Sequence, residues 1–116
     1  MTVEKIIECC IKRKEILEHN KPIKEYNKYY NIMRKYARCL IDENKQDELL
    51  PYLNDENVSI RFDIAILLYN SYPNICEKVL NELSNMTVQN GLPKHYIIIS
   101  AAAYDNIKYG IPKDFP

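Results

Sequence analysis

Hydrophobic residues recur every three or four positions over most of the chain, which is the spacing of amphipathic helices. The first such stretch predicts a helix from residue 2 to about residue 18, and the residues along its apolar side, with one lysine among them, are Val3, Ile6, Ile7, Cys10, Lys14 and Leu17. Asn20 and Pro22 end this helix, and proline is well suited to the first turn of the next one. A second helix is therefore predicted from residue 22 to about residue 41, with an apolar side formed by Tyr26, Tyr29, Tyr30, Met33, Ala37 and Leu40.

Residues 49–68, LLPYLNDENVSIRFDIAILL, combine a short leucine-rich helix, an acidic turn and a helix that is apolar on almost every side. The preceding residues 42–48, DENKQDE, predict a polar connector. Asn and Asp side chains in the turn, residues 54–57, are suited to cap the following helix. That helix is predicted from 58 to 72, and a helix that is apolar on most sides packs between neighbours. We therefore expect it to be the central layer of a stack of helices.

Two more helices and a tail complete the predicted order. Pro73 opens a helix that ends near Met86, with apolar positions at Ile75, Cys76, Val79, Leu80 and Leu83. Residues 87–92 predict a loop that contains Gly91, and Pro93 opens a last helix to about residue 109, along one side of which lie Ile97, Ile98, Ala101, Tyr104 and Lys108. Gly110 suits the position after a helix end, and residues 110–116 form a proline-bounded tail. The run YIII has no second strand to pair with, which favours helix.

Size and composition predict a single helical domain, residues 1–116. The chain has only two glycines, which disfavours tight hairpins and phosphate-binding loops. Its first residues do not resemble a signal peptide, and no apolar segment reaches the ~18–20 residues that span a bilayer. The four cysteines lack the spacing of a zinc site, so free thiols in a reducing compartment are expected. We therefore expect a soluble cytoplasmic protein without membrane contacts.

Catalytic chemistry has few candidate residues. A nucleophilic site needs a Cys or Ser beside a His and an orienting carboxylate, and the only histidines are His19 and His95. His19 stands at a helix end and His95 in the first turn of the last helix, where surface positions are expected. HExxH, paired-carboxylate and glycine-rich phosphate motifs do not occur. The sequence therefore predicts that the chain is not an enzyme and binds neither a cofactor nor a metal.

Residues 49–68, continuing to PNICEKVLNEL at 73–83, resemble a HEAT repeat. Such a repeat has a short leucine-rich helix, a turn with Asp or Asn, and a second helix that opens on a valine–arginine pair and continues with a small residue. Here Ile60 and Arg61 stand in place of the pair, and Ala65 at the small position. Ala65 would let neighbouring helices approach closely, while Arg61 would lie along an apolar surface and reach the acidic turn. Phe62 departs from the pattern, because many repeats are polar there.

From about residue 26 to residue 110, the chain is similar to a family of small bacterial HEAT-like proteins of unknown function. The shared features are Leu-Leu-Pro-x-Leu at 49–53, the Ile60–Arg61 pair, and P-x-x-x-x-x-V-L at 73–80. The resemblance implies an all-α fold of about six helices in antiparallel pairs, a right-handed superhelix fragment of the HEAT or armadillo kind. Some relatives look like immunity proteins, which neutralise a toxin delivered by a competing cell.

Charge is uneven along the chain although the formal net charge is zero. Residues 1–41 carry ten basic and five acidic groups, whereas residues 42–116 carry six and eleven. Hairpin loops of a solenoid would bring one set of residues to a single edge, which we call the acidic edge: Asp42, Glu43, Asp47, Glu48, Tyr52, Asp55 and Glu56. Clustered carboxylates steer a basic partner such as a nuclease. The same carboxylates are also compatible with solvent-exposed loops in which they only cap helices.

A second candidate surface is the basic face of the second helix, interleaved with tyrosines, and its residues are Lys24, Lys28, Arg34, Lys35 and Arg38. Such a face could contact phosphates. The chain contains ten tyrosines, most at helical spacing, so half-buried packing is the default expectation, although Tyr is also favoured at binding hot spots.

Three functions are compatible with these observations. The first is an immunity or antitoxin-like protein that binds and neutralises a cognate toxin through the acidic edge. The second is a nucleic-acid-binding helical module that uses the basic face. The third is a structural adaptor that dimerises through exposed Tyr and Leu side chains. The sequence names neither the partner nor the oligomeric state.

Overall fold

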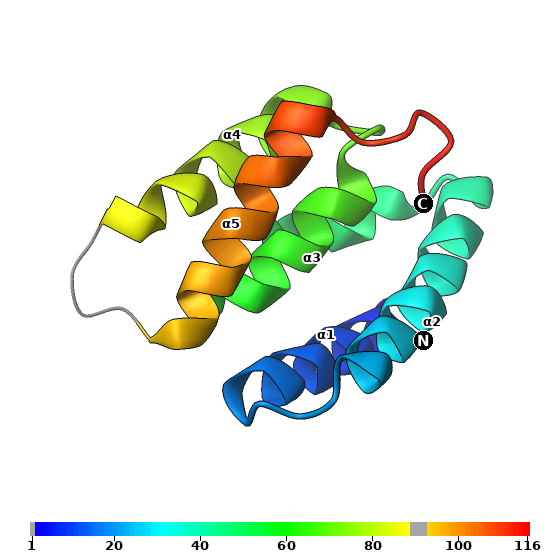
Figure 1. Cartoon of the computed structure of the whole chain (residues 1–116). Coiled ribbons are helices and arrows are strands. Elements are labelled where there is room, and N and C mark those ends of the chain that lie inside the picture. Colours follow the sequence, from blue (N-terminus) through cyan, green and yellow to red (C-terminus); the bar gives the residue numbers. More distant parts are fainter. Residues whose placement is uncertain (1, 89–92) are drawn as a thin grey trace.

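The computed structural model describes residues 2–88 and 93–116, and the regular structure of these two ranges is entirely helical (Figure 1). The elements in chain order are α1 (Thr2–Glu18), α2 (Ile23–Asp42), the 3-10 helix η1 (Gln46–Asn54), α3 (Val58–Leu68), α4 (Pro73–Ser84), the 3-10 helix η2 (Asn85–Val88) and α5 (Lys94–Tyr109). The predicted all-α class is therefore confirmed.

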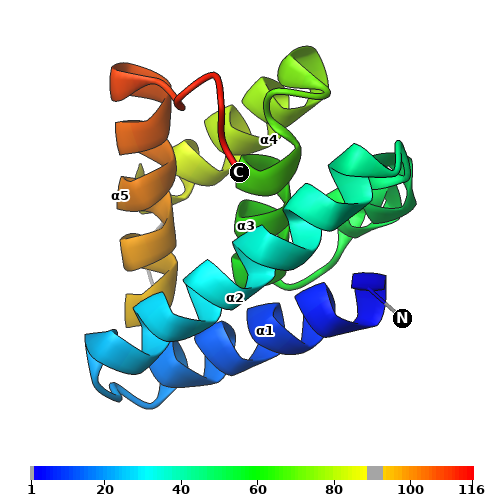
Figure 2. The same cartoon turned by 90° about the vertical axis from the view of Figure 1, so that its right-hand side faces the viewer.

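The helix α3 lies between two hairpins. The first hairpin is α1 and α2, and the second is α4 and α5, each pair lying side by side in opposite directions (Figures 1 and 2). α3 contacts α1, η1, α4 and α5. Ten of its eleven residues are buried, and only Arg61 is partly exposed. The prediction that this helix is the central layer is confirmed, because burial on all sides requires neighbours on all sides.

The start of α3 follows from the Asx residues before it. Oδ1 of Asn57 accepts hydrogen bonds from the backbone N–H groups of Ser59 (3.0 Å) and Ile60 (3.1 Å). Oδ1 of Asp55 accepts from the N–H of Asn57 at 2.8 Å, which fixes the turn. The expected capping role of this turn is thus confirmed.

The end of α3 differs from the prediction. The helix stops at Leu68 instead of continuing to Tyr72. Tyr72 has φ −138° and ψ 65°, outside the helical region, and it precedes Pro73, whose ring disfavours helical geometry in the residue before it. Pro73 instead occupies the first turn of α4.

Smaller differences concern the connectors. Residues 46–48, predicted as part of a polar connector, form the first turn of η1, which the bond from the N–H of Glu48 to the carbonyl of Lys45 closes at 3.1 Å. Pro51 lies inside η1 and not in its first turn. Residues 87–88, predicted as the start of a loop, belong instead to η2. The rest of that predicted loop, residues 89–92 with Gly91, lies outside the described residues. Gly110 follows α5 with φ 82° and ψ 169°, a backbone conformation that glycine adopts readily because it has no Cβ.

The buried sides of α1 and α5 differ from the prediction to different extents. α1 buries Ile6 and Cys10 as predicted, and the predicted Val3, Ile7 and Leu17 pack against the core half-buried. Its buried side also includes Cys9, Arg13 and Ile16, so a charged residue lies within it. On α5, the side marked by Ile97, Ile98, Ala101, Tyr104 and Lys108 is exposed, with Tyr104 56% exposed. α5 packs through Ile99, Ser100 and Ala103 instead. Because α5 carries apolar residues on several sides, its sequence alone did not determine the buried one.

Candidate functional site

The acidic edge lies where α2 ends and η1 begins and ends. Asp42 is the last residue of α2 and Glu43 follows it, whereas Asp47 and Glu48 lie in the first turn of η1. Asp55 and Glu56 follow η1, and Tyr52 is a half-buried residue within it. η1 begins beside the C-terminal end of α2 and then runs alongside α3 (Figures 1 and 2). The structure therefore places Asp42, Glu43, Asp47 and Glu48 near the start of η1, whereas Asp55 and Glu56 follow its other end, nine residues or about 18 Å further on.

Most carboxylates of this edge face solvent without a cationic neighbour. Within residues 2–88 and 93–116, the one ion pair that involves the edge joins Glu43 to Lys45 at 3.6 Å, with both side chains 59% exposed. Asp55 is half-buried and already accepts a hydrogen bond in the turn. Asp42, Asp47, Glu48 and Glu56 are exposed. Arg61, expected to reach this turn, donates instead to the carbonyl of Leu53 (3.2 Å) and to Glu82 on α4 (2.9 Å).

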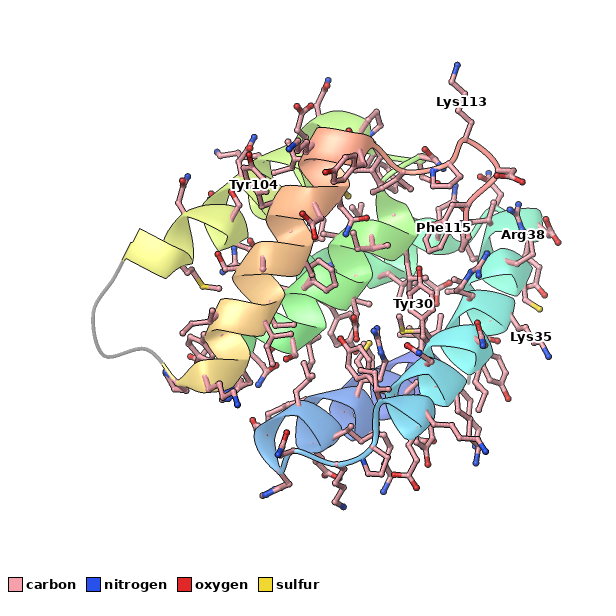
Figure 3. All side chains as sticks on the ribbon, in the orientation of Figure 1. Tyr30, Lys35, Arg38, Tyr104, Lys113 and Phe115 are labelled. Carbon is pink, nitrogen blue, oxygen red and sulfur yellow. The ribbon has the colours of Figure 1, made fainter. Side chains whose placement is uncertain are left out.

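The basic face of α2 is divided by the C-terminal tail, residues 110–116, which folds back onto the helix (Figure 3). Nη2 of Arg38 donates to the carbonyl oxygens of Asp114 (2.6 Å) and Pro116 (2.8 Å). The guanidinium of Arg34 lies 4.7 Å from the ring centroid of Phe115. Two of the five predicted phosphate contacts are thus engaged by the chain itself.

An open hollow of about 570 Å³ lies beside the tail, lined by Asn31, Arg34, Lys35, Arg38 and Pro116. We call it the basic hollow. Lys24 and Lys28 belong to earlier turns of α2 and do not line it; Lys28 places its ammonium 5.6 Å from the ring of Tyr29. The structure therefore brings together three of the five predicted cations.

The tail is held by residues that sequence reasoning missed. Nδ2 of Asn70, just after α3, lies 2.8 Å from the carbonyl oxygens of Pro112 and Phe115 and 3.3 Å from that of Lys113. The Phe115 ring is 9% exposed and stacks on Tyr30 with ring centroids 6.1 Å apart. We call the four residues that hold the tail the tail-docking site: Tyr30, Arg34, Arg38 and Asn70. The signal in the sequence was the pair of apolar residues, Ile111 and Phe115, within the proline-bounded tail.

A buried ion pair joins α1 to α3. Nη1 of Arg13 donates to Oδ1 of Asp63, and the two side chains are 5% and 2% exposed. Two tyrosine rings of α2 cover the guanidinium, with centroids at 3.9 Å for Tyr26 and 4.8 Å for Tyr30. Nε of Arg13 and Oδ2 of Asp63 have no hydrogen-bond partner among the described residues.

Burial shifts the titration of this cluster. It raises the pKa of Asp63 to about 6, and the guanidinium of Arg13 lowers it only in part. Burial also raises the pKa of Tyr26 to about 12 and that of the neighbouring Cys10 thiol well above its ordinary value. The carboxylate of Asp63 is therefore ionised only above mildly acidic pH, and the thiol and the phenol stay neutral there.

The remaining candidate catalytic and metal-binding side chains do not gather at one site in the described residues. Nε2 of His95 lies 3.9 Å from Glu18, and His19 is exposed beyond the end of α1. Across residues 2–88 and 93–116, no three His, Cys, Asp or Glu side chains lie close enough to share a metal ion. None of the helices in these ranges combines the length and the apolar character of a membrane span.

The comparisons with known proteins do not assign the chain to a family. No protein-family model matches the sequence, and neither a curated protein nor a solved structure matches it.

Proposed function

We propose that this chain is a non-catalytic protein-binding module of the immunity or antitoxin kind, which binds a cognate toxin in the cytoplasm and covers its active site. In this proposal the successive pairs α1–α2, η1–α3 and α4–α5 correspond to a fragment of a HEAT-like, right-handed α-solenoid. The toxin is a basic domain, such as a nuclease, and the acidic edge is the surface that meets it.

One observation carries this proposal: the acidic edge is open while the basic face is partly covered. Four carboxylates, those of Asp42, Asp47, Glu48 and Glu56, are exposed and lack an ion pair in the described part of the chain. Clustered charges of one sign raise the rate at which an oppositely charged protein associates. On α2, by contrast, the arginines at 34 and 38 are already engaged by the tail.

A toxin-rescue experiment tests the function. The product of the gene immediately upstream is expressed in a bacterial host, alone or together with this chain, and viable cells are counted. We expect the upstream product to arrest growth and the chain to restore it. Growth that is arrested equally with and without the chain would contradict the proposal.

A charge-reversal experiment tests the surface. The variant Asp47→Lys/Glu48→Lys leaves Asp55 and its turn intact, and Glu77→Lys/Asp105→Lys is a matched control on exposed positions of α4 and α5. The association rate with the toxin, the product of the upstream gene, is measured by stopped-flow mixing at low salt. We expect the edge variant to associate about tenfold more slowly and the control to associate at the wild-type rate. The difference should shrink at high salt because ions screen exposed charges. An unchanged rate for the edge variant would exclude the acidic edge.

The basic hollow favours a second candidate, a nucleic-acid-binding module that uses the basic face of α2. It predicts binding to DNA or RNA that weakens with salt and is lost when Arg34, Lys35 and Arg38 are replaced. Gel shifts at two salt concentrations separate this candidate from the first. The exposed apolar side of α5 favours a third, a dimerising adaptor, which light scattering tests.

A further inference from the structure

We propose that the tail-docking site and the basic hollow together form a docking site for an extended acidic peptide of a partner protein. An aromatic residue of that peptide takes the place of Phe115, and acidic residues that follow it enter the basic hollow. The proposal goes beyond the toxin-binding function and does not depend on the acidic edge.

The tail-docking site holds its segment mainly through the main chain. Asn70 and Arg38 donate only to main-chain oxygens, from positions 112 to 116 of the tail. The side chains of Lys113 and Asp114 are exposed. A site that binds carbonyl groups places few demands on the side chains of its ligand, as in other modes of extended-peptide recognition. Segments of different sequence therefore fit the same donors.

The one side chain that the site does require of its ligand is an aromatic ring. Phe115 is the buried member of the tail, and its ring contacts Tyr30 and the guanidinium of Arg34, which also lies 5.6 Å from the Tyr30 ring. An aromatic ring packed against a tyrosine and an arginine combines apolar burial with a cation–π contact. This is the composition typical of a binding hot spot, in which one ring anchors the ligand.

The basic hollow determines the charge of the preferred ligand. Arg34, Lys35 and Arg38 line it, together with Asn31, and the tail contributes only Pro116 to its wall. Since Arg38 donates to the carbonyl of Pro116, a residue that follows this position in a bound peptide reaches the hollow directly. Three cations and an amide complement carboxylates, and guanidinium groups bind them in bidentate geometry.

The chain's own tail competes with such a ligand. A segment tethered beside its site has an effective concentration in the millimolar range, so a free peptide must bind more tightly than the tail to displace it. The acidic side chains of such a peptide add ion pairs in the hollow to the main-chain contact that the tail makes there through Pro116, which favours displacement. Weakening the tail should therefore increase the apparent affinity for the peptide.

Fluorescence anisotropy with two labelled peptides tests the proposal. Both repeat the tail sequence Ile-Pro-Lys-Asp-Phe-Pro, and one continues with two glutamates, the other with two lysines. The full chain is measured as wild type and as Phe115→Ala, with Phe115→Leu as a second, milder way to loosen the tail. We expect the glutamate peptide to bind the loosened variants about tenfold more tightly than wild type, and about tenfold more tightly than the lysine peptide.

Matched charge reversals on the loosened variant locate the site. Lys35→Glu changes the hollow, and Lys28→Glu makes the same change one to two turns earlier on α2, outside the hollow. We expect the first to weaken binding of the glutamate peptide about tenfold and the second to change it less than about twofold. Replacing the phenylalanine of the peptide by alanine should abolish binding.

Three results would overturn the proposal. The first is absence of saturable binding by both loosened variants at millimolar peptide, with native circular dichroism. The second is equal affinity for the glutamate and lysine peptides. The third is equal weakening by the substitutions at 28 and 35, which would show a nonspecific charge effect.

Discussion

Arg13 and Asp63 are fifty positions apart in the sequence, yet the guanidinium of the first donates a hydrogen bond to the carboxylate of the second inside the core. The pair links α1, and through it the first hairpin, to the central helix. Both groups are buried away from water. If a substitution removes one of them, the other remains in the core as an uncompensated polar group.

The first prediction concerns this pair. Asp63→Ala should lower the free energy of unfolding by about 3–5 kcal/mol at about pH 8, because it leaves the guanidinium of Arg13 buried without its partner. Chemical denaturation followed by circular dichroism measures the change. The matched control is Glu82→Ala, which removes the exposed partner of Arg61 and should cost less than about 1 kcal/mol.

Removing both charges together distinguishes the pair from a simple packing effect. Arg13→Met/Asp63→Leu should recover most of the stability that Asp63→Ala loses, because apolar side chains of similar size replace a buried ion pair at little cost. If the double variant were less stable than Asp63→Ala, or if Glu82→Ala cost as much, the buried pair would not have the assigned role.

The second prediction is a pH dependence of opposite sign to ordinary acid denaturation. Burial raises the pKa of Asp63 to about 6 from 3.8, so between these values the folded protein holds a proton that the unfolded chain has released. The contribution of Asp63 to stability is therefore complete below about pH 4 and is lost as the pH rises through about 6. We expect a loss on the order of 2–3 kcal/mol, at 1.36 kcal/mol for each unit of pKa.

Comparison with Asp63→Asn isolates this contribution from the other carboxylates. The groups that face Asp63 are Arg13, Cys9 and Cys10 from α1 and Tyr26 and Tyr30 from α2. None of these titrates between about pH 4 and 6. As the pH is raised from about 4 to 6, the wild type should lose stability and the variant should not. The free energy of unfolding of the variant minus that of wild type should therefore increase. Asp105→Asn, at an exposed position, should give a nearly constant difference. A constant difference for Asp63→Asn would refute the assignment.

Local periodicity was sufficient for the helices and for the central position of α3. The bounds of α1 and α2 followed from apolar spacing and from Asn20 and Pro22, and the cap at Asn57 followed from turn chemistry. These features depend on neighbours within a few residues, which a single sequence contains. The half-buried state expected of the tyrosines is confirmed for eight of the ten, the exceptions being Tyr104 and Tyr109.

The features that were missed depend on contacts between distant residues. Arg13 occupies a core position of α1 because Asp63 and two tyrosine rings receive its charge, and nothing near residue 13 indicates this. The docking of Phe115 likewise depends on Asn70, 45 positions earlier. Of the two predicted surfaces, the acidic residues are divided between the two ends of η1, and the tail divides the basic face, since its main-chain oxygens occupy Arg38.

The third prediction tests how the tail is held. Asn70→Ala removes the donor shared by three tail carbonyls, which remain hydrated at the surface, so stability should fall by only about 1 kcal/mol. The tail itself should loosen more clearly: exchange of the Phe115 amide hydrogen, which is bonded to the carbonyl of Pro112 at 3.1 Å, should accelerate about fivefold or more. Asn74→Ala, at an exposed position of α4, is the control and should leave that exchange unchanged. Equal exchange in the two variants would show that Asn70 does not hold the tail.

The fourth prediction concerns the cysteines, which are all free. The thiolate is the reactive form, and burial keeps a thiol protonated. Burial raises the pKa of Cys76 to about 12 and also raises the pKa of Cys9 and Cys10, whereas Cys39 on α2 is exposed. A thiol reagent at mildly alkaline pH should therefore label one cysteine rapidly in the native protein and four in denaturant. Cys39→Ser should abolish the rapid phase and Cys76→Ser should retain it. A rapid phase of two or more thiols would contradict the prediction, because it would mean that a buried thiol of α1 or α4 becomes accessible on the time scale of labelling.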